Sequence, residues 1–215
     1  MAQAFYGEVK MNEQGFFIFD VETSTLYNDK LTVDHKKQAW IVEFACVKVD
    51  KDLKEIGAFS SLMQPPFPES IILPEATAIH GISIEDSTTK GMPYHKLYEV
   101  LKPVFDGNFK LVGHNVGFDF KFLHMFPKTH DERINLAKAS YTGICTMKSS
   151  IDYCKLPPTA SMLAKGMKTF KSPKLAELFK CLFNEDMEEA HHAGADVRAT
   201  LKCLRELVKI GVIVL

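Results

Sequence analysis

The sequence has 215 residues, of which 46% are hydrophobic and 25% charged. These values are ordinary for one globular domain and exclude a wholly disordered, collagen-like or coiled-coil chain. The 26 Lys and Arg residues and 27 Asp and Glu residues leave a net charge of −1, which provides no overall attraction to nucleic acid or to an anionic membrane.

Cysteine usage and hydropathy narrow the class of protein further. The five cysteines are odd in number and include no Cys-x-x-Cys pair, which argues against a disulfide framework and against a zinc site. No apolar run reaches the roughly 18–20 residues that span a bilayer. Because the N-terminus also lacks the features of a signal peptide, we expect a cytoplasmic protein.

The first half of the chain is expected to be rich in strands. Residues 1–14 are polar and predict an N-terminal arm, followed by a single domain over 15–215. An apolar run that ends on an acid predicts a buried strand over 15–21. After a polar loop over 24–38, we expect strands from 39 to about 49 and near 58–63, before the prolines of 64–68 interrupt regular structure.

The second half is expected to alternate between helices and strands. Apolar spacing predicts, in chain order, helices over 75–81 and 93–105, a strand over 109–112, and helices over 118–125, 145–153, 173–182 and 193–210. Ser172 is expected to cap the helix over 173–182, with Pro173 at its first position. This order predicts an α/β fold with a mixed central β-sheet flanked by helices.

An acidic segment, Asp20-Val21-Glu22-Thr23, follows the first apolar strand. Alternate residues of a strand share a face, so the two carboxylates project together about 6.6 Å apart. They repel each other unless a cation lies between them, and oxygen ligands suit Mg²⁺ or Mn²⁺. A solvated strand end is the alternative, but the open end of an α/β sheet is where ligands bind.

Two further segments combine acids with histidine. In Gly113-His114-Asn115-Val116-Gly117-Phe118-Asp119, a strand runs into a helix, and Asp119 could serve only the helix dipole. In the other, His191 and His192 precede Asp196. Helical geometry places His192 and Asp196 on one face, so His191 can act beside Asp196 only from a position before the helix.

In this order the segments resemble the DEDDh class of the DnaQ-like 3′–5′ exonucleases, a family with an RNase H-like fold. The residues that match the family motifs are Asp20-Val21-Glu22-Thr23, then His114-Asn115-Val116-Gly117-Phe118-Asp119, then His191, Ala193 and Asp196. Ile79-His80-Gly81-Ile82 matches a further family element, and Ile144-Cys145-Thr146-Met147-Lys148 is similar to the exonuclease X branch. The resemblance extends from about residue 15 to residue 208.

The resemblance implies a catalytic centre with two divalent cations, Mg²⁺ or Mn²⁺, about 3.5–4 Å apart around the scissile phosphate. The implied ligands are Asp20, Glu22, Asp119 and Asp196. One cation would lower the pKa of the attacking water, and the other would neutralise charge on the leaving 3′ oxygen. Family spacing makes His191 the acceptor of the water's proton, and we choose it over His192, which the i,i+4 spacing favours.

The implied substrate is nucleic acid with a free 3′ end, shortened to nucleoside 5′-monophosphates. The expected contact residues are Val21, Thr23, Ile79, His80, His114, Asn115 and Phe118, although Phe118 could equally belong to the core. DNA is the leading substrate and RNA the alternative. A binding domain without catalysis is less favoured because all four acids and the histidine are present. A homodimer or a polymerase partner stays open.

The near-zero net charge conceals a local basic stretch. Residues 161–181 contain five lysines against the single acid Glu177. Among them, Lys168 and Lys171 are candidates for sequence-independent phosphate contacts, with a solvated loop as the alternative. Bulk neutrality is therefore compatible with a nucleic-acid partner.

Overall fold

The computed structural model describes residues 15–32, 35–105, 107, 109–123, 143–187 and 192–215. The predicted N-terminal arm over 1–14 and the predicted general base His191 therefore lie outside the described residues. All five cysteines are described and are free thiols, as the sequence led us to expect. Within the described ranges, we find no helix long and apolar enough to cross a membrane.

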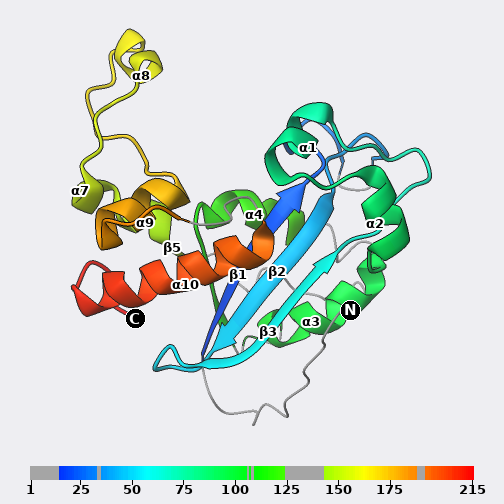
Figure 1. The fold of residues 1–215 in the computed structure, drawn as a ribbon, viewed down its shortest axis with the longest axis horizontal. Coiled ribbons are helices and arrows are strands. Elements are labelled where there is room, and N and C mark those ends of the chain that lie inside the picture. Colours follow the sequence, from blue (N-terminus) through cyan, green and yellow to red (C-terminus); the bar gives the residue numbers. More distant parts are fainter. Residues whose placement is uncertain (1–14, 33–34, 106, 108, 124–142, 188–191) are drawn as a thin grey trace.

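A five-stranded mixed sheet forms the centre of the molecule (Figure 1). Its strands are β1 (Gly15–Thr23), β2 (Ile41–Val49), β3 (Glu55–Leu62), β4 (Phe109–Gly113) and β5 (Ile144–Cys145). The spatial order is β3-β2-β1-β4-β5. β1, β2 and β3 pair antiparallel, whereas β4 lies parallel to β1 and to β5. The predicted α/β fold with a mixed sheet is confirmed.

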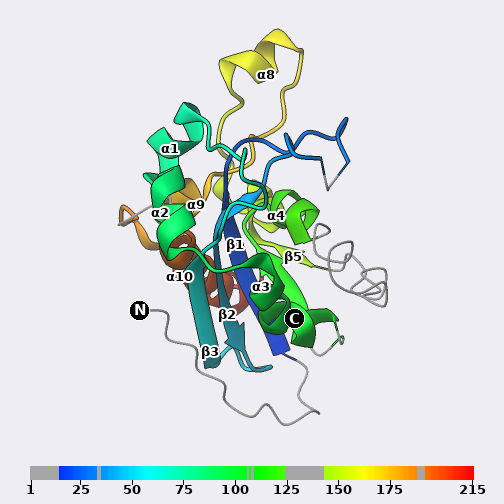
Figure 2. The same ribbon diagram turned by 90° about the vertical axis from the view of Figure 1, so that its right-hand side faces the viewer.

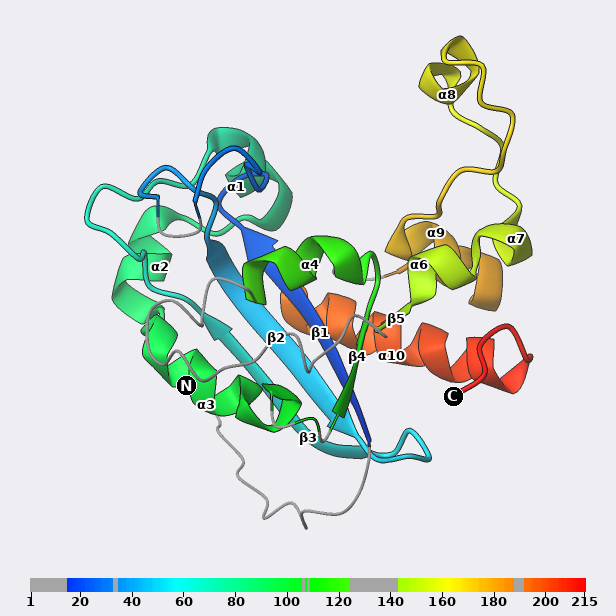
Figure 3. The ribbon, with the colours of Figure 1, turned by 180° about the vertical axis from the view of Figure 1, so that it is seen from behind.

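Helices cover both faces of this sheet. The helices of the described residues are α1 (Pro74–His80), α2 (Ile84–Lys90), α3 (Tyr94–Phe105), α4 (Val116–Leu123), α6 (Thr146–Ser149), α7 (Ile151–Cys154), α8 (Ala160–Ala164), α9 (Leu175–Phe183) and α10 (Ala193–Lys209), of which α8 stands away from the sheet. α10 crosses one face in Figure 1, whereas α3 and α4 lie on the opposite face in Figure 3.

The alternation of side chains along β1 determines where the site forms. Phe17 and Phe19 pack into the core under α3 and α4, and Phe16 and Ile18 pack into the core under α10. A strand that is covered on both faces has apolar side chains at consecutive positions, which explains the apolar run over residues 16–19. Because residues i and i+2 share a face, Asp20 and Glu22 continue the row of Phe16 and Ile18 and face α10.

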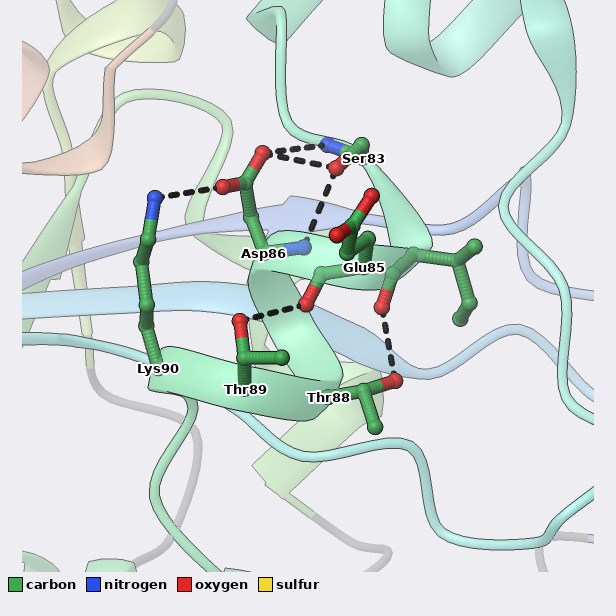
Figure 4. A network of polar contacts seen from close by, with 7 residues as sticks. Ser83, Glu85, Asp86, Thr88, Thr89 and Lys90 are labelled. Carbon is green, nitrogen blue, oxygen red and sulfur yellow. Dashed lines mark hydrogen bonds and ion pairs between the residues drawn. The ribbon is translucent and has the colours of Figure 1, made fainter.

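The helix α2 was not predicted, although its start is well specified. The Ser83 hydroxyl accepts a hydrogen bond from Asp86 N–H (3.0 Å) and donates one to the Asp86 carboxylate (Figure 4). Lys90 pairs with the same carboxylate one turn later, at 2.6 Å. This reciprocal capping box compensates for a short helix with few apolar residues.

Other element boundaries differ from the predictions. The expected helix over 173–182 begins at Leu175 with Lys174 as its N-cap, so the assignment of Ser172 as the cap was wrong. Glu177 supplies the alternative, because its carboxylate accepts a hydrogen bond from Lys174 N–H at 2.8 Å. The helix expected over 145–153 is divided into α6 and α7 at Ser150.

Candidate active site

Three carboxylates meet where β1 ends. Asp20 and Glu22 face α10, and Asp196 lies in the first turn of that helix. Each of the three offers an oxygen within 4.8 Å of the others. Three ionised carboxylates at this distance repel one another. A divalent cation such as Mg²⁺ or Mn²⁺ would offset the repulsion, because these cations prefer oxygen ligands. The donor set therefore fits a metal centre.

Two of these acids, Asp20 and Glu22, have raised pKa values, because their surroundings disfavour the charged form. Burial raises the pKa of Asp20 well above its usual range, and the neighbouring acids, Asp119 foremost, raise it further. Burial likewise raises the pKa of Glu22 to about 8, with Asp196 as the largest charge contribution. A bound cation would reverse this effect by stabilising the ionised carboxylates.

Asp119 borders the three-acid group. It lies in the first turn of α4, which follows β4, and its exposed fraction is 3%. Burial raises its pKa to about 8, although the backbone N–H groups of Asp119 and Val21 oppose the shift. β1 and β4 are parallel neighbours, so their carboxyl ends lie at one edge of the sheet. The structure thus groups three of the four expected ligands and places the fourth beside them.

Glu43 is a residue of this site that the sequence analysis missed. It lies on β2 opposite Glu22 in the strand register. Its carboxylate accepts a hydrogen bond from Ala193 N–H (3.1 Å), and its charge contributes to the raised pKa of both Asp20 and Glu22. The available signal was a single acid within an apolar run, which indicates a buried carboxylate with a specific partner.

His192 is the N-cap of α10, and its side chain is exposed. Its Nδ1 lies 4.0 Å from Glu43 Oε2. The Glu43 carboxylate is therefore a close neighbour of His192. The choice of His191 over His192 as the general base stays a prediction.

The residues that follow the first motif differ in how they could contact a substrate. The Val21 side chain is buried, so only its backbone is available to contact a substrate. The Thr23 hydroxyl donates a hydrogen bond to the Thr25 carbonyl at 3.0 Å. Ile79 is exposed on α1, whereas His80 is buried and its Nδ1 accepts a hydrogen bond from Ile82 N–H at 3.0 Å. Burial lowers the pKa of His80, the Thr23 backbone opposes that shift, and His192 adds to it.

His114 is engaged within the protein through both ring nitrogens. Nε2 lies 3.0 Å from the Pro173 carbonyl and Nδ1 lies 3.0 Å from the Thr146 hydroxyl. A carbonyl can only accept, and burial lowers the pKa of His114, so we assign the neutral ring with the proton on Nε2. His114 therefore positions the segment around Pro173, a role that the sequence analysis did not foresee.

Two other residues of the second motif lie on α4 or directly before it. Asn115 is exposed and adopts a left-handed backbone conformation with φ of 70°, which Asn tolerates better than most residues. Phe118 packs against Phe122, with ring centroids 5.3 Å apart, at the edge of the core. The expectation that Phe118 could be a core residue agrees with this packing.

The two candidate phosphate-binding lysines differ in their surroundings. Lys171 Nζ lies 2.5 Å from Glu177 Oε1 in a partly buried ion pair. Lys168 is exposed and, among the described residues, has no ion-pair partner. Lys171 is thus held by the protein, and Lys168 is open to an external anion.

A cavity of about 570 Å³ opens directly after the first motif. Its wall is formed by Ser24, Thr25, Lys36, Lys37, Gln38, Trp40, Glu69, Ser70, Ile71 and Leu73. Lys36 and Glu69 pair at 3.4 Å, and Trp40 Nε1 donates a hydrogen bond to the Ile71 carbonyl at 3.1 Å. This volume lies within the range of small-molecule sites.

A profile of the exonuclease family RNase_T matches residues 17–204, a range that contains all four acids. The chain belongs to this exonuclease family. The chain is similar to the DNA polymerase III PolC-type proteins of Lacticaseibacillus paracasei (30% identity over 90% of the chain) and Listeria monocytogenes (29% over 94%). It spans only 11–12% of the length of these relatives.

Solved structures of exonuclease I are similar in fold to this chain. One covers 92% of the chain and 41% of its own, with a TM-score of 0.68 and 20% identity. The Escherichia coli enzyme in complex with a dA16 oligonucleotide gives a TM-score of 0.66 at 20% identity, with the same coverage. Together with the family match, these likenesses confirm the RNase H-like, DnaQ-like fold that the motifs implied.

Proposed function

We propose that this exonuclease belongs to the DEDDh class and releases nucleoside 5′-monophosphates from the 3′ end of DNA. The observation that carries the proposal is the group formed by Asp20, Glu22 and Asp196, whose oxygens lie within 4.8 Å of one another. These residues come from both ends of the chain, and each belongs to a motif of the family. Burying three like charges close together costs free energy, and bound cations at a phosphate would offset that cost.

Asp20, Glu22, Asp119 and Asp196 would hold the divalent cations, Mg²⁺ or Mn²⁺. Bound cations supply activation of water and stabilisation of charge on the phosphate and the leaving oxygen. His191 would accept the proton of the attacking water, because a neutral imidazole near pH 7 is a suitable base. Glu43 would position the start of α10, which carries Asp196, through its hydrogen bond to Ala193 N–H.

The terminal nucleotide would lie against the residues after β1. The backbone of Val21 and Thr23, together with Ile79 and His80, would contact the sugar and base. The cavity that begins at Ser24 offers space next to this position. Asn115 would approach from the start of α4, where its side chain is exposed.

The preference for DNA rests on the relatives. The sequence relatives are named as DNA polymerases, and one structural neighbour was solved with the DNA oligonucleotide dA16. RNA is the alternative substrate of the same chemistry, because a few contacts to the 2′-hydroxyl decide between the two.

The test is an incubation of the purified protein with 5′-labelled single-stranded DNA, duplex DNA and RNA of one sequence. Each substrate is combined with Mg²⁺, Mn²⁺ or EDTA. We expect a ladder of products shortened from the 3′ end that requires the metal and is absent for Asp20→Ala. Products that retain full length in every condition, or a ladder that persists in Asp20→Ala, would contradict the proposal.

A further inference from the structure

A narrow arm leaves the body of the exonuclease between α7 and α9 and carries α8 at its tip (Figures 1 and 3). We call residues 155–173 the α8 arm. It rises on the side of the sheet where β5 lies, whereas α1 lies on the other side in Figures 1 and 3. The arm points toward the end of the molecule at which β1 ends (Figure 2), and the acidic cluster lies at the end of β1.

The base of the α8 arm is fixed to the body. Lys171 N–H donates a hydrogen bond to the Leu156 carbonyl at 3.1 Å, which joins the two sides of the arm. The side chain of Lys171 is held by Glu177 on α9. The Pro173 carbonyl accepts a hydrogen bond from His114, directly after β4, at 3.0 Å. The arm is therefore positioned by a residue of the second motif.

The tip of the arm is folded although it has no core of its own. Thr159 caps α8 by accepting a hydrogen bond from Met162 N–H at 3.2 Å. Met167 N–H donates to the Met162 carbonyl at 2.9 Å across a turn at Gly166, whose φ of 74° favours glycine. These local hydrogen bonds present the side chains of the tip to solvent in a defined arrangement.

The exposed residues of the arm include lysines and large apolar side chains but no acid. Between Asp152 and Glu177 the sequence contains no acid and the following lysines: Lys155, Lys165, Lys168, Lys171 and Lys174. Leu163, Met167 and Phe170 are 55%, 43% and 41% exposed. In the part of the chain that the structure describes, Lys165 and Lys168 have no ion-pair partner.

This combination fits single-stranded nucleic acid. A single strand offers phosphates for the lysines and unpaired bases whose faces stack on apolar and aromatic side chains. A duplex offers the phosphates but keeps its base faces stacked inside the helix. A solvated loop would account for the lysines, but it gives no reason for three large apolar side chains to be exposed among them.

We propose that the α8 arm binds the unpaired nucleotides upstream of the 3′ end, with Lys165 and Lys168 at phosphates and Phe170 against a base. The inference rests on the proposed exonuclease function and adds a binding surface to it, for a single-stranded 3′ segment of several nucleotides. Lys171 belongs to the base of the arm and not to the binding surface.

The test compares two substrates of the full chain. A single-stranded 20-mer reaches both the cluster and the arm, whereas the p-nitrophenyl ester of thymidine 5′-monophosphate reaches only the cluster. For the double variant Lys165→Glu/Lys168→Glu we expect kcat/KM on the 20-mer to fall about tenfold or more. The slope of log binding constant against log salt concentration should become shallower by about 1.4, because each of the two lost phosphate contacts contributes about 0.7. For Phe170→Ala we expect a loss of at least about fivefold. Hydrolysis of the ester should stay unchanged in both variants.

The matched controls are Lys54→Glu, at the exposed β2–β3 turn, and Ile210→Ala, whose side chain is 41% exposed like that of Phe170. Neither should change either rate. A 20-mer rate that is unaffected by the arm variants, or that falls together with the ester rate, would overturn the inference. An equal loss on a fully paired blunt duplex would refute stacking on unpaired bases.

Two further outcomes distinguish strand binding by the α8 arm from self-association and from the exonuclease activity itself. If sedimentation shows that the arm variants convert a dimer into a monomer with unchanged kcat/KM, the arm is a contact between copies and the inference is wrong. If the wild-type protein hydrolyses neither substrate but still binds the 20-mer through the arm, the proposed function fails and the arm inference survives.

Discussion

The Glu43 carboxylate on β2 accepts a hydrogen bond from the backbone N–H of Ala193, the first residue of α10, at 3.1 Å. This contact joins residues 150 positions apart in the sequence. It also brings a carboxylate to the positive end of the helix dipole, three residues before Asp196. A residue of the strand that pairs with the first motif therefore holds the start of α10, the helix that carries Asp196.

Replacement of Glu43 tests this positioning role. Glu43→Ala removes the acceptor at the start of α10, so we expect a loss of about 1 kcal/mol of stability and at least a tenfold fall in kcat with little change in KM. Glu43→Gln keeps an acceptor oxygen and should recover most of the stability and part of kcat. Thermal melts and steady-state kinetics measure both. An equal loss of kcat for Gln and for Ala would mean that the charge of Glu43, and not its hydrogen bond to Ala193, is what matters.

The raised pKa values of the cluster predict how the metal-free protein responds to pH. The pKa of Glu22 is about 8 in the folded protein and 4.5 as its ordinary value, so the folded state binds more protons between these values. Stability in EDTA should therefore fall as pH rises from about 4.5 to 8 and then level off. Added Mg²⁺ should reduce the fall, because it stabilises the ionised carboxylates. Melting temperatures across this range measure the effect.

Glu22→Gln provides the control for that pH dependence. The variant removes one titrating carboxyl and one source of repulsion. We therefore expect a higher melting temperature than wild type at pH 8 in EDTA, with exonuclease activity reduced at least a hundredfold. If Glu22→Gln is less stable than wild type at pH 8 without metal, the cluster is not under electrostatic strain.

The two adjacent histidines differ in their expected importance for turnover. His191→Ala should abolish cleavage because it removes the proposed proton acceptor. His192→Ala should retain most activity, since this side chain is exposed and its near neighbour is Glu43. Single-turnover rates of both variants decide the matter. Equal losses in the two variants, or a loss only for His192→Ala, would transfer the role to His192.

His114 is expected to support structure instead of touching substrate. Its replacement by Phe leaves the Thr146 hydroxyl and the Pro173 carbonyl without their ring partner, at a cost of about 1–3 kcal/mol. Urea unfolding measures this loss. With the arm base released, KM for a single-stranded 20-mer should rise while kcat/KM for the small ester changes little. An unchanged stability would show that the two hydrogen bonds contribute nothing.

The sequence by itself indicated four of the five strands, β1 to β4, and the three acids that meet at the end of β1, whereas β5 was not predicted. The spacing of Asp20 and Glu22 already indicated that the two carboxylates share one face of the strand, because the side-chain period of a strand is two. Ser83 and Asp86 also form a recognisable capping box at the start of α2. This helix was not predicted because it has few apolar residues.

Only the tertiary structure decided which polar groups meet across long sequence distances. Nothing local in the chain links Glu43 to Ala193 or His114 to Pro173, and Lys171 turned out to be held by Glu177. Nor does sequence show that Lys168 and Phe170 stand on an arm away from the core. Hydrophobic periodicity and motifs can be recognised within a single segment of the chain. These hydrogen bonds and ion pairs, in contrast, depend on how separate segments pack together.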